Sequence, residues 1–589
     1  MYDKMYITNC SIISWKFTSV FLIILYISSS ESNPISHFTV ASGVNGGSNC
    51  AGCTVVVSLI EQLGEIHNET VVKALDRLCS YLPPKIKGPC QVFAQFIGPI
   101  LVELVTQDAN PDTVCQTLRF CNTNGGPECL LYKKDEFQVN DMKQKPKNLN
   151  LMMKHSYFLS ADPKICEIPG IKDICKLLDD AFRYHDPSVD IDGDKYSTAE
   201  TFRGTSWRGR DCNDDDKYTH PGSRPIDYDA TDDSNCNGIY GSDPATTKPY
   251  EEEFCANSQA RGIAVLGDSL SAHFHLPEEW FDATKLSEAV LKDALFIIEN
   301  EIDWPELSTV TGHVNNSWPE VVHGSMDSIY QRLFERNHCN HGDYQNIAVN
   351  GADTGEMVTN IMYSLSRNQT LDIPILVTYA LVGNDVCNGH PDTFAHMTTV
   401  EDMKANSLKT LQYLDTILPN NSYVMVMGLA DGRVLYDNLH DRIHPLGRLR
   451  NDITYTMIYD YLNCLQISPC TGWMNSNGTV RNLTTEHAET LSTALQQVVQ
   501  QYGKTFKNFK IQYIDCPLTE VFDVWTKSGG QAWQLIEPVD GFHSNQMGQA
   551  LTAQIMWDNM VKLYPDFIGP VNPFNKQIEE IFGNQMRSV

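Results

Sequence analysis

Six cysteines between residues 50 and 121 constrain the fold of this chain more than any other feature. The residues between them follow a helical period: in CQVFAQFIGPILVELV, residues 90–105, apolar side chains recur at spacings of three and four. Two helix-like stretches precede this one, and a shorter one follows it. We therefore predict a small bundle of short helices held by disulfides, although the sequence alone leaves many pairings open. The cysteines are Cys50, Cys53, Cys79, Cys90, Cys115 and Cys121.

This cysteine spacing resembles that of saposin B-type domains over residues 46–125. An opening Cys-x-x-Cys and a late pair of cysteines separated by five residues carry the resemblance. It implies an apolar face that binds lipids. The alternative is a disulfide-held helical bundle without a ligand. The resemblance also implies three nested disulfides, namely Cys50–Cys121, Cys53–Cys115 and Cys79–Cys90.

The N-terminus has the features of a secretory signal peptide, which we place at residues 1–32. Lys16 precedes the apolar run FTSVFLIILYI, and polar residues follow it. This run matches the apolar core of a signal peptide and is short for a membrane span, although a signal anchor is the alternative. Six N-glycosylation sequons lie further along the chain, so we expect a secreted, lysosomal or endosomal glycoprotein. They begin at Asn68, Asn315, Asn368, Asn420, Asn477 and Asn482.

The charge of the chain limits its partners. There are 44 basic and 73 acidic residues, which give a net charge of −29. Such an acidic protein repels phosphate backbones, so we expect no nucleic-acid partner. The same charge excludes binding to anionic membranes by bulk electrostatics.

A polar, lysine-rich stretch follows the cysteine-rich unit. It is weakly periodic and includes YKKDEFQVNDMKQKPKNLNLMMKH, residues 132–155. We interpret residues 128–165 as an exposed linker, a type of segment in which proteolytic nicking concentrates.

Residues 186–243 are dense in Asp, Asn and Gly, and we interpret them as a calcium-binding segment. Oxygen-bearing side chains alternate along it, as in DIDGD. In a tight loop such side chains point inward at one hard cation, and about six to eight flexible oxygen ligands suit Ca²⁺ better than Mg²⁺. The alternative is a solvated acidic loop. The candidate ligands are Asp186, Asp190, Asp192, Asp194, Asp211, Asn213, Asp214, Asp216, Asp229, Asp233, Asn235 and Asn237.

The remaining cysteines agree with an oxidising compartment. Cys212 and Cys236 lie within the acidic segment and are placed to join two of its loops. The chain has 18 cysteines, and removal of Cys10 with the signal peptide leaves 17. One thiol is therefore free or bridges to another molecule.

The pattern changes again over residues 260–575, which we interpret as an α/β domain. Apolar strand-like runs alternate with helix-like stretches such as AETLSTALQQVVQQY. This alternation predicts βαβ units and a parallel sheet covered by helices. The strand-like runs are GIAVL, PILVTYALV, SYVMVMGL and FKIQYIDC.

Four short blocks in this domain carry the residues of a serine esterase. Ser269 follows the run GIAVL in the block GDSL, where an open parallel sheet places its sites. NGADTG carries Gly351, LVGNDV carries Asn384, and PVDGFH carries Asp540 and His543. The Gly-x-Ser-x-Gly elbow of α/β-hydrolases is absent from the sequence.

Ser, Gly, Asn and His in this order resemble the SGNH or GDSL hydrolases. The resemblance implies that Ser269 is the nucleophile and His543 its base, with Asp540 orienting the base. Gly351 and Asn384 would stabilise the oxyanion, together with the backbone N–H of Ser269. No cofactor is expected to take part in the chemistry, and calcium would be structural.

Two other Asp-x-x-His pairs compete for the role of the base. They are Asp437 with His440 and Asp441 with His444, in YDNLHDRIH. They also come after a strand-like run. We prefer Asp540 and His543 because they follow the last of the strand-like runs and directly precede an amphipathic helix.

The order of the parts over nearly the whole chain resembles the acyloxyacyl hydrolase family. Stretches such as WRGRDCND, DWPEL, GNDVC and QLIEPVDGFH carry this resemblance. It implies removal of secondary, ester-linked acyl chains from the lipid A of lipopolysaccharide. It also implies cleavage in the linker into two disulfide-linked chains, for which Cys129 is placed to bridge to Cys464. The alternatives are a secreted phospholipase or general lipid esterase, and a non-catalytic lipid-binding protein.

Overall fold

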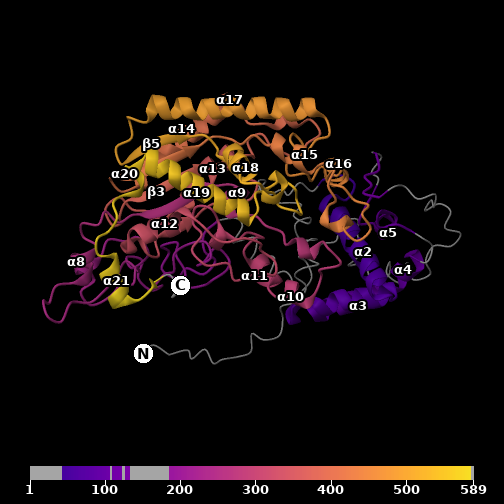
Figure 1. Cartoon of the computed structure of the whole chain (residues 1–589), viewed down its shortest axis with the longest axis horizontal. Coiled ribbons are helices and arrows are strands. Elements are labelled where there is room, and N and C mark those ends of the chain that lie inside the picture. The colour runs from indigo at the N-terminus through magenta and orange to yellow at the C-terminus, as the bar shows by residue number, and fades with distance from the viewer. Residues whose placement is uncertain (1–42, 106–108, 123–126, 133–184, 586–589) are drawn as a thin grey trace, which may run out of the picture.

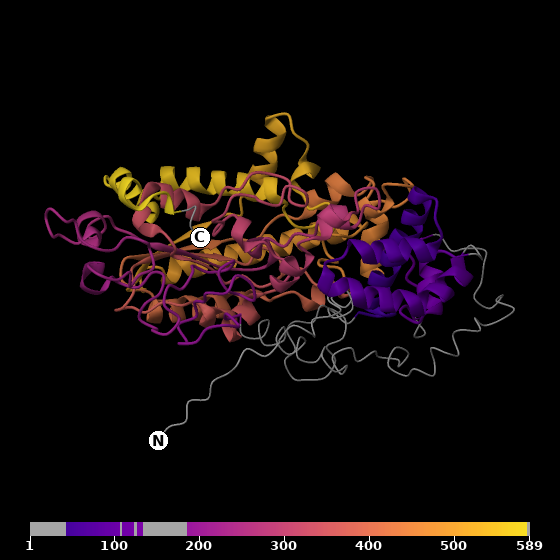
Figure 2. The ribbon, with the colours of Figure 1, turned by 90° about the horizontal axis from the view of Figure 1, so that it is seen from below.

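The computed structural model describes residues 43–105, 109–122, 127–132 and 185–585. The predicted signal peptide, residues 1–32, and residues 133–165 of the predicted linker lie outside these ranges. The described residues form a helical unit at one end of a larger α/β unit (Figures 1 and 2). Among these residues no helix is both long and apolar enough to cross a membrane.

The helical unit consists of four helices, as the cysteine-rich pattern predicts. Local capping defines two of them: Thr70 accepts a hydrogen bond from the N–H of Lys73, and Asn110 accepts one from Thr113 before Pro111 at the first helical position. Three disulfides join the helices in nested order, Cys50–Cys121, Cys53–Cys115 and Cys79–Cys90. The helices are α2 (Gly47–His67), α3 (Val71–Tyr81), α4 (Pro84–Val105) and α5 (Pro111–Thr117).

The α/β unit is built on a parallel sheet, which confirms the predicted fold class. Its five strands lie in the order β2-β1-β3-β4-β5 and all pair in parallel. Order reverses between β1 and β3, and open α/β sheets bind ligands at such a switch point. The strands are β1 (Gly262–Gly267), β2 (Tyr344–Asn346), β3 (Ile375–Ala380), β4 (Ser422–Met427) and β5 (Phe509–Ile514).

Four of these strands match the apolar runs in the sequence, whereas β2 was missed. It has only three residues, and two of them, Gln345 and Asn346, are polar. Buried partners satisfy them: Gln345 Nε2 donates to Tyr196 Oη at 2.8 Å, and Asn346 Nδ2 donates to Ser271 O at 2.9 Å. Hydropathy therefore gave no signal at this edge of the sheet.

Alternate residues of each strand face opposite layers of helices, so both faces of the sheet are covered. Ala264 and Val377 belong to a core shared with α13, α14 and α17, whereas Val265 and Leu376 belong to one shared with α12 and α19. The helices are α8 (Tyr250–Phe254), α9 (Ser269–Ala272), α10 (Glu288–Leu291), α11 (Ala294–Glu299), α12 (Ile329–Arg336), α13 (Thr354–Thr359), α14 (Val400–Ile417), α15 (Arg433–Leu439), α16 (Tyr455–Cys464), α17 (Gly478–Tyr502), α18 (Leu518–Lys527), α19 (Gln546–Leu563), α20 (Pro565–Ile568) and α21 (Asn575–Phe582).

The helical unit and the α/β unit share one hydrophobic core. Leu59 and Leu63 of α2 belong to the same buried cluster as Leu286, Trp304 and Ile458 of the α/β unit. A disulfide between Cys129 and Cys464 also joins the two units, as the sequence suggested. The helical unit is therefore docked on the α/β unit rather than tethered to it.

The acidic segment consists mainly of loops, with one short 3-10 helix at Ile226–Asp229, and it runs along the edge strand β2. The N–H of Gly209 donates to Tyr344 O at 2.9 Å, and the N–H of Asn346 donates to Trp207 O at 2.7 Å. Trp207 packs with Ala272 of α9 and with Ala348 just beyond β2. A disulfide between Cys212 and Cys236 joins two of the loops, as expected.

Cys516 is the free cysteine among the described residues. It lies just after β5, where burial raises the pKa of its thiol to about 12. Such a thiol stays protonated at neutral pH and is a poor nucleophile.

Candidate active site

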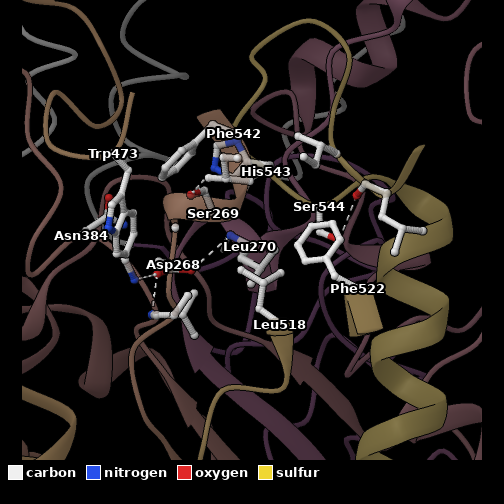
Figure 3. Close-up of a pocket in the computed structure, with 17 residues that line it drawn as sticks. Asp268, Ser269, Leu270, Asn384, Trp473, Leu518, Phe522, Phe542, His543 and Ser544 are labelled. Carbon is white, nitrogen blue, oxygen red and sulfur yellow. Dashed lines mark hydrogen bonds between the residues drawn. The ribbon is translucent and has the colours of Figure 1, made fainter. Parts of the chain in front are cut away.

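The candidate nucleophile lies at the carboxyl end of β1, at the switch point of the sheet. Ser269 is the first residue of α9, and Asp268 caps this helix by accepting a hydrogen bond from the N–H of Leu270 at 3.1 Å. The backbone therefore turns sharply from strand to helix at the serine. This turn directs its Oγ into a cavity (Figure 3).

The structure brings Ser269, His543 and Asp540 into one hydrogen-bonded chain. His543 Nε2 lies 2.7 Å from Ser269 Oγ, and His543 Nδ1 lies 2.5 Å from Asp540 Oδ2. Asp540 Oδ1 also accepts hydrogen bonds from the backbone N–H groups of Phe542 and His543, which fix the carboxylate in place. The arrangement is that of a nucleophile, a base and a carboxylate that orients the base.

The environment of His543 stabilises the protonated form of its imidazole. Burial lowers the pKa of its imidazole, but the nearby Asp540 carboxylate more than offsets burial, so the pKa is raised above its ordinary value. A raised pKa strengthens the imidazole as a base.

The competing histidines lie outside the cavity lining. His440 stacks on Tyr436, and its Nδ1 lies 3.0 Å from the carbonyl oxygen of the same residue. His444 is buried and contacts the backbone of Val539 instead of a serine. The hydrogen-bond contacts of both histidines are therefore with backbone groups and not with Ser269.

Of the two candidate oxyanion donors, Asn384 lines the cavity and Gly351 does not. Asn384 follows β3, and Asp268 Oδ2 holds the preceding turn by accepting from the N–H groups of Val382 and Gly383 at 2.8 and 3.2 Å. Gly351 lies in an exposed turn with a φ of 79°. The structure thus favours Asn384 as a donor at this site.

Asp268 is a residue whose role the sequence did not reveal. It is buried, and burial raises the pKa of its carboxyl to about 6. Its carboxylate accepts hydrogen bonds from three backbone N–H groups and so joins the nucleophile helix to the turn before Asn384. Its place between the Gly and the Ser of GDSL was the available signal.

The rest of the cavity lining is mainly apolar, as an acyl chain requires. A second cavity adjoins the first, and the two share Leu270, Val382, Leu518 and Ser544. Figure 3 shows Leu270, Leu518 and Phe522 on one side of Ser269. The apolar residues that line the first cavity are Leu270, Val382, Ala430, Leu435, Trp473, Leu518, Phe522, Leu535, Ile536 and Phe542.

The structure places five of the candidate metal ligands in two close groups that share one residue. Asp190, Asp192 and Asp194 form one close group, and Asp192, Asp211 and Asp214 form another. One carboxylate oxygen each of Asp192, Asp194 and Asp211 is buried without a hydrogen-bond partner. Buried oxygens of this kind are what a bound cation would satisfy.

A second group of candidate ligands lies in the loop at residues 229–237. Asp233 accepts from the N–H groups of Asn237 and Gly238, and Asp229 has one buried oxygen without a partner. Glu251, which the sequence did not single out, accepts from the side-chain amides of Asn235 and Asn237 at 3.2 and 3.1 Å.

The side chains of two candidate ligands, Asp186 and Asp216, have other partners. Asp186 contacts Ser364 and lies 3.5 Å from the Arg208 guanidinium. The N–H of Asn213 donates to Asp211, and Asp216 accepts from the backbone of Tyr218 at 3.3 Å. These contacts place Asp186 in an ion pair, so it is the weakest candidate.

Comparison with known proteins agrees with this two-part structure. Residues 49–176 match the family described as saposin-like domain, and residues 263–556 match GDSL-like lipase/acylhydrolase. The chain is 44% identical over 575 residues to the acyloxyacyl hydrolase of Homo sapiens, covering 97% of this chain and 99% of that protein. The Mus musculus acyloxyacyl hydrolase is equally similar, and that of Oryctolagus cuniculus is 45% identical over 91% of this chain.

The chain belongs to the acyloxyacyl hydrolase family. It is therefore an ester hydrolase that combines a saposin-like unit with a GDSL-type hydrolase unit, as the sequence predicted. Its saposin-like unit is also 31% identical over 74 residues to the saposin-C of Cavia porcellus, covering 91% of that protein.

Proposed function

We propose that this chain is a serine esterase in which Ser269, His543 and Asp540 form the catalytic triad. His543 Nε2 removes the proton from Ser269 Oγ as this oxygen attacks the ester carbonyl. The tetrahedral intermediate collapses when the same proton passes to the leaving alcohol, which gives an acyl-serine. His543 then deprotonates a water, which attacks the acyl-serine. The fatty acid is released as the proton on His543 returns to Ser269 Oγ. The hydrogen-bonded chain of the three side chains carries this proposal.

Asn384 is proposed as an oxyanion donor, together with the backbone N–H of Ser269. Changing Asn384 to alanine is expected to lower kcat about 10²–10³-fold, because the negative charge on the carbonyl oxygen loses a preorganised donor. KM should change little. Steady-state kinetics on a soluble ester measures both constants, and an unchanged kcat would remove Asn384 from the site.

We propose that the substrate is lipid A, from which the enzyme removes secondary, ester-linked acyl chains. The name of the relatives supports an acyl group esterified to another acyl group as the target. A lipid with many chains needs an apolar shelter for those that do not react, and the saposin-like unit lies on the same chain. Because the net charge is −29, the apolar chains should drive binding.

Substrate preference distinguishes the proposal from its alternatives. The wild-type enzyme is expected to release fatty acid from lipid A much faster than from a phospholipid in mixed micelles. Faster release from the phospholipid would favour a secreted phospholipase. Lipid binding without release of fatty acid from either substrate would favour a non-catalytic lipid-binding protein. Quantifying the released fatty acids by mass spectrometry in both assays decides among the three.

We further propose that the acidic segment binds structural Ca²⁺. The candidate ligands are Asp190, Asp192, Asp194, Asp211 and Asp214, since they form two close groups that share Asp192 and three of them have a buried oxygen without a partner. Asp229, Asp233, Asn235 and Asn237, together with Glu251, are the candidate ligands in the second loop. In both places the ion would supply positive charge that offsets the repulsion between carboxylates.

Chelation is expected to lower the melting temperature, and added Ca²⁺ should restore it by mass action, whereas Mg²⁺ should do so poorly. Activity should fall with stability because Trp207 of this segment packs against the nucleophile helix. Differential scanning calorimetry with and without chelator measures the shift. Asp211→Asn should weaken the response, while Asp227→Asn, an exposed control, should not. An unchanged melting temperature, with no metal found by elemental analysis, would contradict the proposal.

Passage through the secretory pathway is also a proposal. All six sequon asparagines are exposed, as glycosylation requires. Cleavage within the linker would leave two chains joined by the Cys129–Cys464 disulfide. We accordingly propose a secreted or lysosomal glycoprotein of two disulfide-linked chains.

A further inference from the structure

Two segments of the hydrolase unit touch both the saposin-like unit and residues 537–543, which we call the base turn because they carry Asp540 and His543. The first segment is α16. The second is the short turn from His444 to Leu446. Each has one set of contacts with the base turn and another with α2 or its surroundings.

α16 holds the base turn through two tyrosines one helical turn apart. Tyr455 Oη donates to Pro538 O at 2.5 Å, and Tyr459 Oη donates to Gly541 O at 2.8 Å. Gly541 has a φ of 61°, and a Cβ at this position would lie 2.4 Å from Tyr459 Oη. The buried tyrosine therefore fits closely against a glycine and fixes the position of the turn.

The other contacts of α16 are with the saposin-like unit. Tyr461 Oη donates to Thr54 Oγ1 at 3.0 Å, and Cys464 forms the disulfide with Cys129. Tyr455 and Tyr459 belong to the core of the hydrolase unit, whereas Tyr461 belongs to the core shared with the saposin-like unit. Because a helix has 3.6 residues per turn, these positions form two faces of one rigid element.

The second segment makes the same connection through a chain of hydrogen bonds. Gln62 Nε2 of α2 donates to Leu446 O at 2.9 Å, and the N–H of Leu446 donates to His444 Nδ1 at 3.1 Å. Since Nδ1 accepts, the other ring nitrogen of this neutral imidazole carries the hydrogen, and it donates to Val539 O at 2.8 Å. The histidine that competed for the role of the base in the sequence thus braces the turn that carries His543.

We propose that the docked saposin-like unit positions the catalytic base. It holds α16 and the His444–Leu446 turn, and these hold three carbonyl groups of the base turn, so the alignment of His543 with Ser269 depends on docking. This inference rests on the proposed function, which assigns His543 as the base. It gives the saposin-like unit a role in turnover that does not require the unit to bind lipid.

A short, water-soluble ester tests this role because it needs no lipid shelter. Tyr461→Phe combined with Gln62→Met removes docking contacts without touching the base turn, whereas Tyr459→Phe removes a contact on the base turn itself. Tyr330→Phe is the matched control, since this buried hydroxyl accepts from the N–H of Gly342 in another part of the molecule. We measure kcat per active serine, titrated with a fluorophosphonate, together with the melting temperature.

Tyr459→Phe and the double variant are each expected to lower kcat about 10-fold at unchanged KM, because misalignment costs turnover and not ground-state binding. Tyr330→Phe should lower the melting temperature and leave kcat unchanged. When Tyr459→Phe is combined with the double variant, kcat should fall by less than the product of the two separate fold-losses, because both variants act on the base turn. Tyr461→Phe alone, which removes one oxygen, replaces the double variant if that variant fails to fold.

The outcomes separate this inference from the proposed function. A wild-type kcat in the docking variants, with Ser269→Ala inactive, overturns the inference whatever Tyr459→Phe does, and leaves the proposed function standing. Activity that survives in Ser269→Ala overturns the proposed function itself. If Tyr330→Phe lowers kcat as much as the docking variants do, the losses come from general destabilisation, and the positioning role is overturned.

Discussion

Replacing Ser269 by alanine is expected to abolish ester hydrolysis and leave the fold intact. Turnover should fall by about 10⁴-fold or more, because the acyl-enzyme pathway needs this oxygen as the nucleophile. The side chain of Ser269 is small, and its hydroxyl bonds only to His543 in the triad. Removing it leaves the hydrogen bond between His543 and the Asp540 carboxylate in place. The variant should therefore melt close to the wild-type temperature. Fatty acid release from lipid A and from a soluble ester, with a thermal melt, measures both expectations.

The control for this variant lies in the same helix. Ser271→Ala changes a buried serine of α9 two residues further on. It should retain hydrolysis of the soluble ester, since its hydroxyl lies outside the hydrogen-bonded chain of Ser269, His543 and Asp540. Equal losses in Ser269→Ala and Ser271→Ala would show that the region tolerates no change, and the nucleophile would then have to be identified by covalent labelling.

Sequence reasoning succeeded where the chemistry lies within a short stretch of chain. Asp540 and His543 are three residues apart, and Ser269 directly follows an apolar strand, so both patterns are readable without a structure. Strands β1, β3 and β4 are buried along their whole length and are mainly apolar because both of their faces are covered. The edge strand β5 is only partly buried, and it carries Lys510 and Gln512 between apolar residues. Strand β2 lacks this signal, since Gln345 and Asn346 are buried through hydrogen bonds and not through hydropathy.

Contacts between distant segments could not be predicted in the same way. Gln62 and Leu446 are 384 residues apart, and Tyr459 and Gly541 are 82 residues apart. The local sequence does not show whether His444 is a structural residue or a catalytic base, because His444 and His543 both follow an aspartate by three residues. Only the fold shows that His444 contacts a carbonyl group, whereas His543 contacts a serine.

The acidic segment shows the same limit. Its aspartates look alike in the sequence, yet Asp186 forms an ion pair with Arg208, whereas Asp194 and Asp211 converge with their neighbours. Burial raises the pKa of Asp194 to about 8 and that of Asp211 to about 6, which reflects the cost of burying carboxylates close together. Spacing identified the segment, and burial identifies which members would gain most from a cation.

The shared core also changes how the saposin-like unit should be tested. The sequence reads as two separate domains, which suggests deleting the saposin-like unit, residues 46–125. However, Leu286, Trp304 and Ile458 of the hydrolase unit pack in one cluster with the saposin-like unit. Deletion would expose these side chains to water and destabilise the hydrolase unit, whatever the unit does for lipids. Single substitutions at the docking face are therefore more informative than truncation.

His543→Ala is expected to lower kcat about as much as Ser269→Ala, because a serine hydroxyl is a weak nucleophile without a base. His440→Ala should keep most of the activity, since His440 stacks on Tyr436 and lies outside the cavity lining. It is the matched control, another histidine three residues after an aspartate. Loss of activity in His440→Ala with activity retained in His543→Ala would move the base to the other pair.

Asp540→Asn extends this prediction to the orienting carboxylate. Asp540 accepts from His543 Nδ1 and from the backbone N–H groups of Phe542 and His543. In an asparagine the amide oxygen would accept from the two backbone groups, and the NH₂ group would then face the N–H at His543 Nδ1. The imidazole would then favour the tautomer with its hydrogen on Nε2, which cannot take the proton from Ser269. We expect kcat to fall about 10⁴-fold while KM and the fold are kept. Kinetics over a range of pH separates this from a shift in pKa, because the wrong tautomer is inactive at every pH. Recovery of the wild-type kcat at high pH would instead show that Asp540 acts only on the pKa of His543.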